Sequence, residues 1–150
     1  MFPAPIPYSV RFRINDPDLG HINVLDEDGN LWTLQDPGIR YWLELPRFSQ
    51  ELVLYLPSPL YPTEKGGLGT WRLVYPPGMS LIDVYGAIVT FYNRPLSKEE
   101  RHLALKAGYD RWLPQLRSDQ IVTVGDLFID IPIFEDLIPY LDGFTLLLGR

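Results

Sequence analysis

The sequence predicts an α+β fold, in which a mostly antiparallel sheet packs against two or three short helices. Two changes of periodicity support this prediction. Alternating apolar residues near the start of the chain are typical of strands, whereas three-and-four spacing over residues 80–113 is typical of helices. Short β-branched and apolar runs then return after residue 120. With 150 residues, 46% of them hydrophobic, the chain can bury a sizeable core, so we expect one domain over residues 1–150.

The first predicted strand covers residues 8–14, where apolar side chains alternate with polar ones. Residues 21–25 and 31–35 flank a five-residue loop of acidic and turn-forming residues. This pattern predicts a β-hairpin, and Gly29 supplies the positive φ that such a turn needs.

Prolines and glycines bound the next predicted strands. Ile39–Leu45 is expected to be extended, because Pro46 disfavours a helical residue before it. Glu51–Leu56 predicts a buried strand, and Thr70–Tyr75 predicts a short one. Between them, Lys65–Gly69 is expected to be a flexible loop, because its lysine precedes the glycines and a strand follows, unlike a phosphate-binding P-loop.

Residues 80–113 predict two helices between the strand-rich ends of the chain. Ser80 and Asp83 resemble a capping box, in which each side chain accepts a hydrogen bond from the other residue's backbone N–H. The apolar residues that follow predict one wide buried stripe: Leu81, Val84, Tyr85, Ile88, Val89 and Tyr92. Ser97 and Glu100 form a second capping box, which opens a helix expected to end near residue 113.

The last third predicts a return to extended structure. Ile121–Val124 is β-branched and is expected to be a short strand, which residues 125–132 either continue or reverse. Phe134–Tyr140 is expected to form a helical turn. Gly143–Leu148 is apolar and predicts a final buried strand.

The part of the chain from Leu52 to Gly149 also carries a recognisable series of motifs. In order, these are Ser80–Tyr92, Pro95-Leu96-Ser97 with Glu99 and Glu100, Val124-Gly125-Asp126-Leu127, Phe134-Glu135-Asp136-Leu137, and Asp142–Gly149. The series resembles an uncharacterised domain family of large DNA viruses of amoebae (marseillevirus- and mimivirus-like) and of basidiomycete fungi. Asp136 stands where that family has glycine. The ending is closer to the viral members.

The resemblance covers about two thirds of the chain and contains no catalytic motif. It implies a small α+β domain encoded by a large DNA virus. Such a protein is expected to act inside the host cell, in the cytoplasm, the viral factory or the nucleus.

Composition excludes several classes of partner and site. The absence of cysteine excludes disulfides and thiolate metal sites, and favours an intracellular protein. The net charge of −6 argues against specific nucleic-acid binding; Arg11 and Arg13 share one face of the first predicted strand, but they are too few for it. No apolar run is long enough to span a membrane. Residues 1–7 form a proline-rich arm without the features of a signal peptide.

No catalytic motif is visible, so we expect a non-enzymatic protein without a cofactor or metal. The sequence lacks a Gly-x-Ser-x-Gly elbow, and His21 and His102 do not have the spacing of a two-histidine metal site. The alternative is a small hydrolase or ligand-binding enzyme that uses His102 and a carboxylate. Asp110 lies eight residues after His102, on roughly the same face of the predicted helix.

The aromatic residues give the most usable functional signal. The chain holds four Trp, nine Tyr and seven Phe, and several lie in or beside proline-rich segments. Aromatic and arginine side chains are enriched at binding hot spots, although aromatics also fill cores. The candidate interaction surface consists of Tyr41, Trp42, Phe48, Tyr61, Trp71 and Arg94. The leading hypothesis is therefore a protein that binds a host or viral protein as a monomer or homodimer; a virion structural component is a further alternative.

Overall fold

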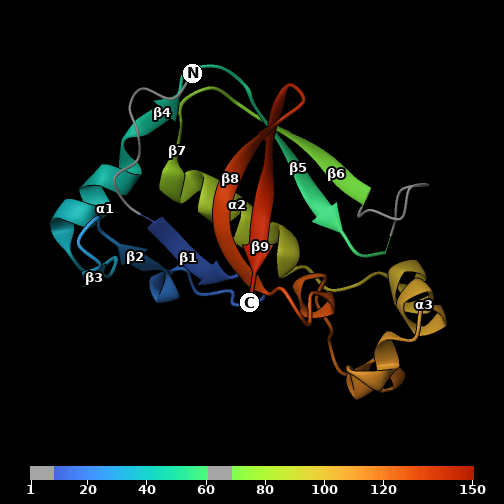
Figure 1. Ribbon diagram of the computed structural model, residues 1–150. Coiled ribbons are helices and arrows are strands. Elements are labelled where there is room, and N and C mark those ends of the chain that lie inside the picture. Colours follow the sequence, from blue (N-terminus) through green and yellow to red (C-terminus); the bar gives the residue numbers. More distant parts are fainter. Residues whose placement is uncertain (1–8, 61–68) are drawn as a thin grey trace.

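The computed structural model describes residues 9–60 and 69–150 as a mostly antiparallel sheet with helices on one face (Figure 1). The strands are β1 (Ser9–Arg13), β2 (Asn23–Leu25), β3 (Leu31–Trp32), β4 (Pro46–Phe48), β5 (Leu52–Ser58), β6 (Gly69–Tyr75), β7 (Met79–Ser80), β8 (Ile133–Tyr140) and β9 (Gly143–Gly149). The helices are α1 (Pro37–Glu44), α2 (Leu81–Tyr92) and α3 (Lys98–Lys106), with the short 3-10 helices η1 (Leu19–His21), η2 (Tyr109–Arg111), η3 (Pro114–Arg117) and η4 (Gly125–Leu127). The predicted α+β fold is confirmed.

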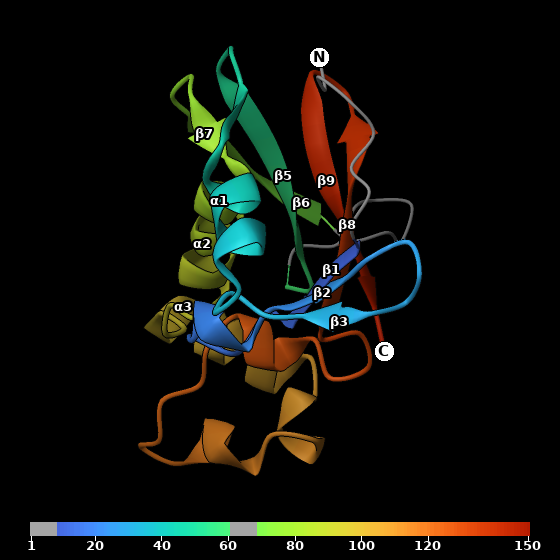
Figure 2. The same cartoon turned by 90° about the vertical axis from the view of Figure 1, so that its left-hand side faces the viewer.

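The main sheet has seven strands in the order β3-β2-β1-β8-β9-β5-β6, while β4 and β7 form a separate pair. All its described strand pairs are antiparallel except β5 and β9. Figure 2 shows α1 and α2 on the same side of this sheet, where they cover its inner face. Three sequence-based predictions concern residues outside the described ranges: the arm at residues 1–7, Tyr61, and the loop predicted at Lys65–Gly69. Of that loop, only Gly69 is described, and it begins β6.

The first hairpin forms where the sequence predicts it, but its strands are shorter, because His21 lies in η1 and the second strand ends at Trp32. β2 pairs antiparallel with β3, and Gly29 has a φ of 81° in the connecting turn. Asp26 organises that turn, because its carboxylate accepts hydrogen bonds from the backbone N–H groups of Asp28 and Asn30 and from the indole N–H of Trp32. The local turn chemistry therefore sets the turn, and β2 also pairs with β1.

The predicted extended segment Ile39–Leu45 is wrong, because most of it lies in α1. Asp36 is the N-cap and accepts a hydrogen bond from the backbone N–H of Ile39, and Pro37 occupies the first turn, where its missing N–H costs nothing. Ile39 and Leu43 are buried against the core. Pro46 restricts only Leu45, which is extended with a ψ of 133°.

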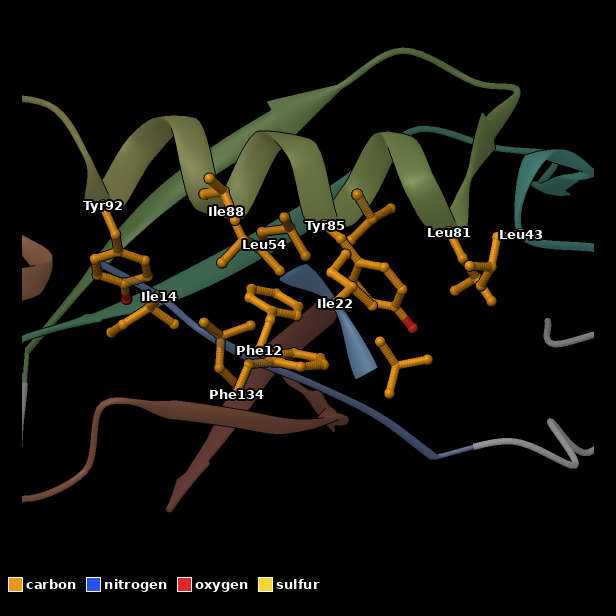
Figure 3. Close-up of a cluster of buried hydrophobic side chains, with 14 of the residues drawn as sticks. Phe12, Ile14, Ile22, Leu43, Leu54, Leu81, Tyr85, Ile88, Tyr92 and Phe134 are labelled. Atoms are coloured by element: carbon orange, nitrogen blue, oxygen red, sulfur yellow. The ribbon is translucent and has the colours of Figure 1, made fainter. Parts of the chain in front are cut away.

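Helix α2 forms the centre of the core, and its N-terminus confirms the predicted capping box. Ser80 accepts a hydrogen bond from the N–H of Asp83, and Asp83 accepts one from the N–H of Ser80. All six residues of the predicted stripe are buried. Figure 3 shows Tyr85 beside Phe12 and Phe134, and the ring centroids of Phe12 and Phe134 are 4.7 Å apart.

Strand β5 is buried along its whole length and continues past the predicted end at Leu56 to Ser58. Proline is tolerated here because Pro57 lies beyond Leu54 and Tyr55, the residues of β5 that pair with β9, so no backbone N–H is required of it. Its carbonyl accepts a hydrogen bond of 2.8 Å from Tyr92 Oη. This bond connects the end of α2 to the end of β5.

Helix α3 ends earlier than the sequence predicts, at Lys106 instead of near residue 113. Gly108 follows with a φ of 85°, a left-handed conformation that closes the helix and lets the chain turn into η2. Arg101 then holds the loop beyond η3, donating hydrogen bonds to four carbonyl groups: those of Gln115, Leu116, Ser118 and Gln120. A second small core forms here from Leu60, Ala104, Leu116, Val122 and Leu127.

Two predictions for the last third are wrong. Ile121–Val124 does not form a strand, because only Thr123 finds a bridge partner, Pro95. Phe134–Tyr140 lies in β8 and is not a helical turn; pairing with β1 and β9 outweighs its local preference. The final strand, Gly143–Leu148, is confirmed within β9, although it is mostly half-buried.

Replacing Val84 of α2 by Asp is expected to destabilise the protein by several kcal/mol, because the side chain is fully buried and the new charge has no partner. Thr90→Asp on the exposed face of the same helix is the control and should cost at most about 1 kcal/mol, the penalty for an acid in the last helical turn. Thermal or urea unfolding measures both. Equal stability of the two variants would show that this face of α2 is not buried.

Candidate interaction site

Three of the predicted surface residues lie on α1 and β4, and only one of them is well exposed. The side chain of Tyr41 is 67% exposed. Trp42 is half-buried beneath the guanidinium of Arg47, 4.2 Å from the ring centroid. Phe48 is half-buried, 6.0 Å from the ring of Phe144. Trp42 and Phe48 therefore pack against the core and present only part of their surface to a partner.

Trp71 and Arg94 lie together in a different place, where β6 passes the end of α2. The ring centroids of Trp71 and Phe91 are 4.9 Å apart, and the Arg94 guanidinium lies over both rings at 5.7 Å and 5.2 Å. Arg94 also donates two hydrogen bonds to Glu100, at 2.7 Å and 2.9 Å. Figure 3 shows Leu43 of α1 beside Leu81, at the opposite end of α2. The described candidates thus form two separate groups.

Strand β6 differs from its neighbour β5 in burial, because it lies at the edge of the sheet. All seven residues of β5 are buried. In β6, Trp71, Leu73 and Tyr75 face the core but stay half-buried, and the residues between them are exposed. A strand on the open side would cover the remaining surface of these three side chains.

The backbone groups of β6 that face the open edge can be identified from the neighbouring strands. Thr145 Oγ1 donates a hydrogen bond of 2.7 Å to the carbonyl oxygen of Tyr55, so that carbonyl faces β9. Tyr55 is opposite Arg72 in the antiparallel β5–β6 pair. Opposite residues in such a pair face each other or face away together. The N–H and C=O groups of Thr70, Arg72 and Val74 therefore point away from β5, toward the open edge.

The two ends of the large sheet are protected differently. Strand β3 closes one end with only two residues, and short edge strands resist further pairing. Strand β6 closes the other end with seven residues in unbroken register with β5. It contains no proline, lysine or bulge, which are the common means of blocking an edge. In the described part of the chain, β6 is thus the long edge open to strand addition.

Arg72 supplies the charge beside this edge. Its guanidinium lies 3.4 Å from Asp142 and donates to the hydroxyl of Tyr55, which itself donates to Asp142. The hydrogen bond from Tyr55 lowers the pKa of Asp142, so this carboxyl stays ionised. Both members of the ion pair are more than half exposed, so Arg72 can also reach an acidic group on a partner.

A separate apolar cavity of about 540 Å³ lies between η2 and the segment after η4. The residues that line it are Pro59, Tyr109, Trp112, Leu127, Phe128, Ile129, Asp130 and Ile131. Trp112 is 69% exposed, so the cavity is wide and open on one side. Asp130 is its one ionisable group besides Tyr109, which gives it little chemistry for catalysis.

His102 lies on the exposed face of α3. Among residues 9–60 and 69–150 it makes no hydrogen bond or ion pair with a carboxylate. It lines neither this cavity nor a second cavity beside β1, whose walls include Arg11 and Arg13. Asp110, its predicted companion, instead binds Arg117 at 2.6 Å. The same part of the chain holds no group of three His, Asp or Glu side chains arranged around a metal position. None of its helices has the length and apolarity required to cross a membrane.

Comparisons with known proteins leave the site to be interpreted from its own geometry. No family model matches the chain, and neither a curated protein nor a solved structure matches it.

The Arg94–Glu100 pair predicts a measurable pH dependence of stability. Glu100 is buried, and its hydrogen bonds with Arg94 lower its pKa from 4.5 to about 2. Its contribution is therefore complete above pH 4.5 and is lost as the pH falls through about 2. At neutral pH, Glu100→Gln should reduce the free energy of unfolding by about 3 kcal/mol.

The control for this prediction is Glu99→Gln in the same helical turn, where the side chain is exposed. The stability difference between wild type and Glu100→Gln should shrink as urea unfolding is repeated at lower pH. The Glu99→Gln difference should stay near zero. A Glu100→Gln difference that does not vary with pH would contradict the assigned ion pair.

Proposed function

We propose that this chain is a non-enzymatic protein that binds an extended segment of a partner protein along the open edge of β6. The observation that carries the proposal is the row of N–H and C=O groups at Thr70, Arg72 and Val74, which point away from β5. A partner strand satisfies these groups with main-chain hydrogen bonds, as in other complexes formed by strand addition.

The side chains around the edge define the partner segment. On the inner side, Trp71, Leu73 and Tyr75 offer half-buried apolar surface, which favours apolar side chains at alternate positions of the segment. On the outer side, Arg72 favours an acidic side chain. The proposed partner segment therefore alternates apolar and polar residues and carries an acid near its centre.

A host-interaction role in a virus-infected cell follows from the sequence resemblance and is part of this proposal. The site needs only an exposed strand in the partner, whether a host or a viral protein supplies it. A role as a virion structural component stays an alternative. Mass spectrometry of purified particles distinguishes it from the host-interaction role, because only a virion component is expected in the particles. The hydrolase alternative has less support, since His102 has no carboxylate partner in the described part of the chain.

Replacing Val74 by Pro is expected to abolish partner binding, because proline removes an N–H group that faces the open edge. The β5–β6 ladder uses the groups of Trp71, Leu73 and Tyr75 and stays intact. Val74→Thr is the matched control, because it keeps both the N–H group and a β-branched shape. The effect is measured by titration with synthetic heptapeptides that alternate apolar and polar residues around one central acid, and with purified proteins cross-linked to the chain in cells.

Hydrogen exchange provides the second readout. On binding, the amides of Thr70, Arg72 and Val74 should gain protection, whereas those of Trp71 and Leu73 are already protected by β5. Thermal melting confirms that Val74→Pro folds. Equal binding by Val74→Pro and Val74→Thr would refute strand addition. If sedimentation shows that a second copy of the chain occupies β6, the proposal of a partner protein is wrong.

A further inference from the structure

A second cavity, of about 490 Å³, lies on the outer face of the sheet, away from the open edge of β6. Strand geometry positions its walls, because alternate residues of β1 share a face. Arg11 and Arg13 both point to this side, with Asn23 of β2 opposite Arg11 and Ile133 of β8 opposite Arg13. Arg150 completes the basic side of the cavity.

The acidic side chains near this cavity already have partners within the protein. Asp16 contacts His21 at 2.6 Å and accepts a hydrogen bond from the backbone of Asp18, whose own carboxylate lies 3.4 Å from His21. Glu135 lies 3.7 Å from Arg11, a distance typical of a weak exposed pair.

The remaining charge on the cavity wall is positive. In the described ranges, the side chains of Arg13 and Arg150 form no ion pair. A local excess of positive charge in a chain of net charge −6 is the reverse of what the overall composition predicts.

We propose that this cavity binds a small phosphate monoester through the guanidinium groups of Arg11, Arg13 and Arg150. Planar guanidinium groups match the oxygens of a phosphate with paired hydrogen bonds, and the amide of Asn23 supplies a further donor. The volume exceeds that of a phosphate alone and falls within the range of small-molecule sites. Ile133 provides an apolar surface for the esterified group.

His21 makes the binding depend on pH. The groups around it are Asp16 and Asp18, with Arg11, Arg13 and Arg150 at the other walls and Glu135 next to Arg11. Its hydrogen bond with Asp16 raises the pKa of His21 above 6.5, so it is protonated below that raised value and neutralises Asp16. As the pH rises through this pKa, the wall loses the positive charge of His21, and anion affinity should fall.

Calorimetric titration with phenyl phosphate and with sulfate tests the proposal. Phenyl phosphate should bind the wild type, and Arg13→Gln should weaken binding at least about tenfold, the usual loss for a charged hydrogen bond. Arg40→Gln is the matched control. It removes the same charge from α1, where Arg40 pairs with Glu44, and should leave affinity unchanged. Sulfate keeps its charge across the range of His21 and should bind more weakly above the pKa of His21 than below it.

The results that would contradict the phosphate-binding proposal can be told apart from one another. Equal losses for Arg13→Gln and Arg40→Gln would show only a general charge effect, and an absence of phenyl phosphate binding by the wild type would refute the site. Tighter binding of malonate than of phenyl phosphate would reassign the cavity to dicarboxylates. Thermal melting of Arg13→Gln shows whether the fold is kept, and NMR shifts confined to β1, η1 and β8 would place the ligand in the cavity.

Discussion

The burial of α2 against the inner face of the large sheet is the constraint on which the remaining structure depends. One stripe of this helix contacts strands from both ends of the chain, so the first and last thirds must meet around it. Polar bonds fix its far end: Tyr92 Oη binds the carbonyl of Pro57 in β5, and the Asn93 side-chain amide binds the carbonyl of Ile14 after β1. Once α2 is in place, β8 and β9 fill the space between β1 and β5. Within the described residues, β6 is then the long edge strand that no further strand covers.

The sequence predicts the elements whose signals are local and misses those whose structure depends on distant partners. Capping boxes and a turn glycine act within a few residues, so α2, the start of α3 and the β2–β3 hairpin are correct. Helix α1 had a local signal too, in Asp36 and Pro37, but its aromatic residues and the following Pro46 favour an extended segment. β8 has acidic residues and a proline that disfavour a strand, and only its pairing with β1 and β9 explains it.

The candidate sites show a similar division. Aromatic composition points to Tyr41, Trp42, Phe48 and Trp71, yet three of the four pack against the core, since the same side chains serve burial and binding equally well. For β6, the sequence predicts a strand but not its place at the edge of the sheet. Whether a strand is central or at an edge depends on sheet order, which is set by pairings far apart in the sequence, such as β5 with β9. That order also determines which alternate backbone groups remain free.

Some arginine side chains hold the fold together, whereas others are available to bind a ligand. Composition alone does not distinguish the two groups. Arg94 donates hydrogen bonds to Glu100 and lies over two aromatic rings, and Arg101 donates hydrogen bonds to four carbonyl groups of one loop. Both side chains hold the α2–α3 region together. Arg11 and Arg13, by contrast, project from a strand whose other face is buried, so their charge serves no packing role. A net charge of −6 therefore describes the average surface, while the alternation of one five-residue strand concentrates the opposite sign at a single cavity.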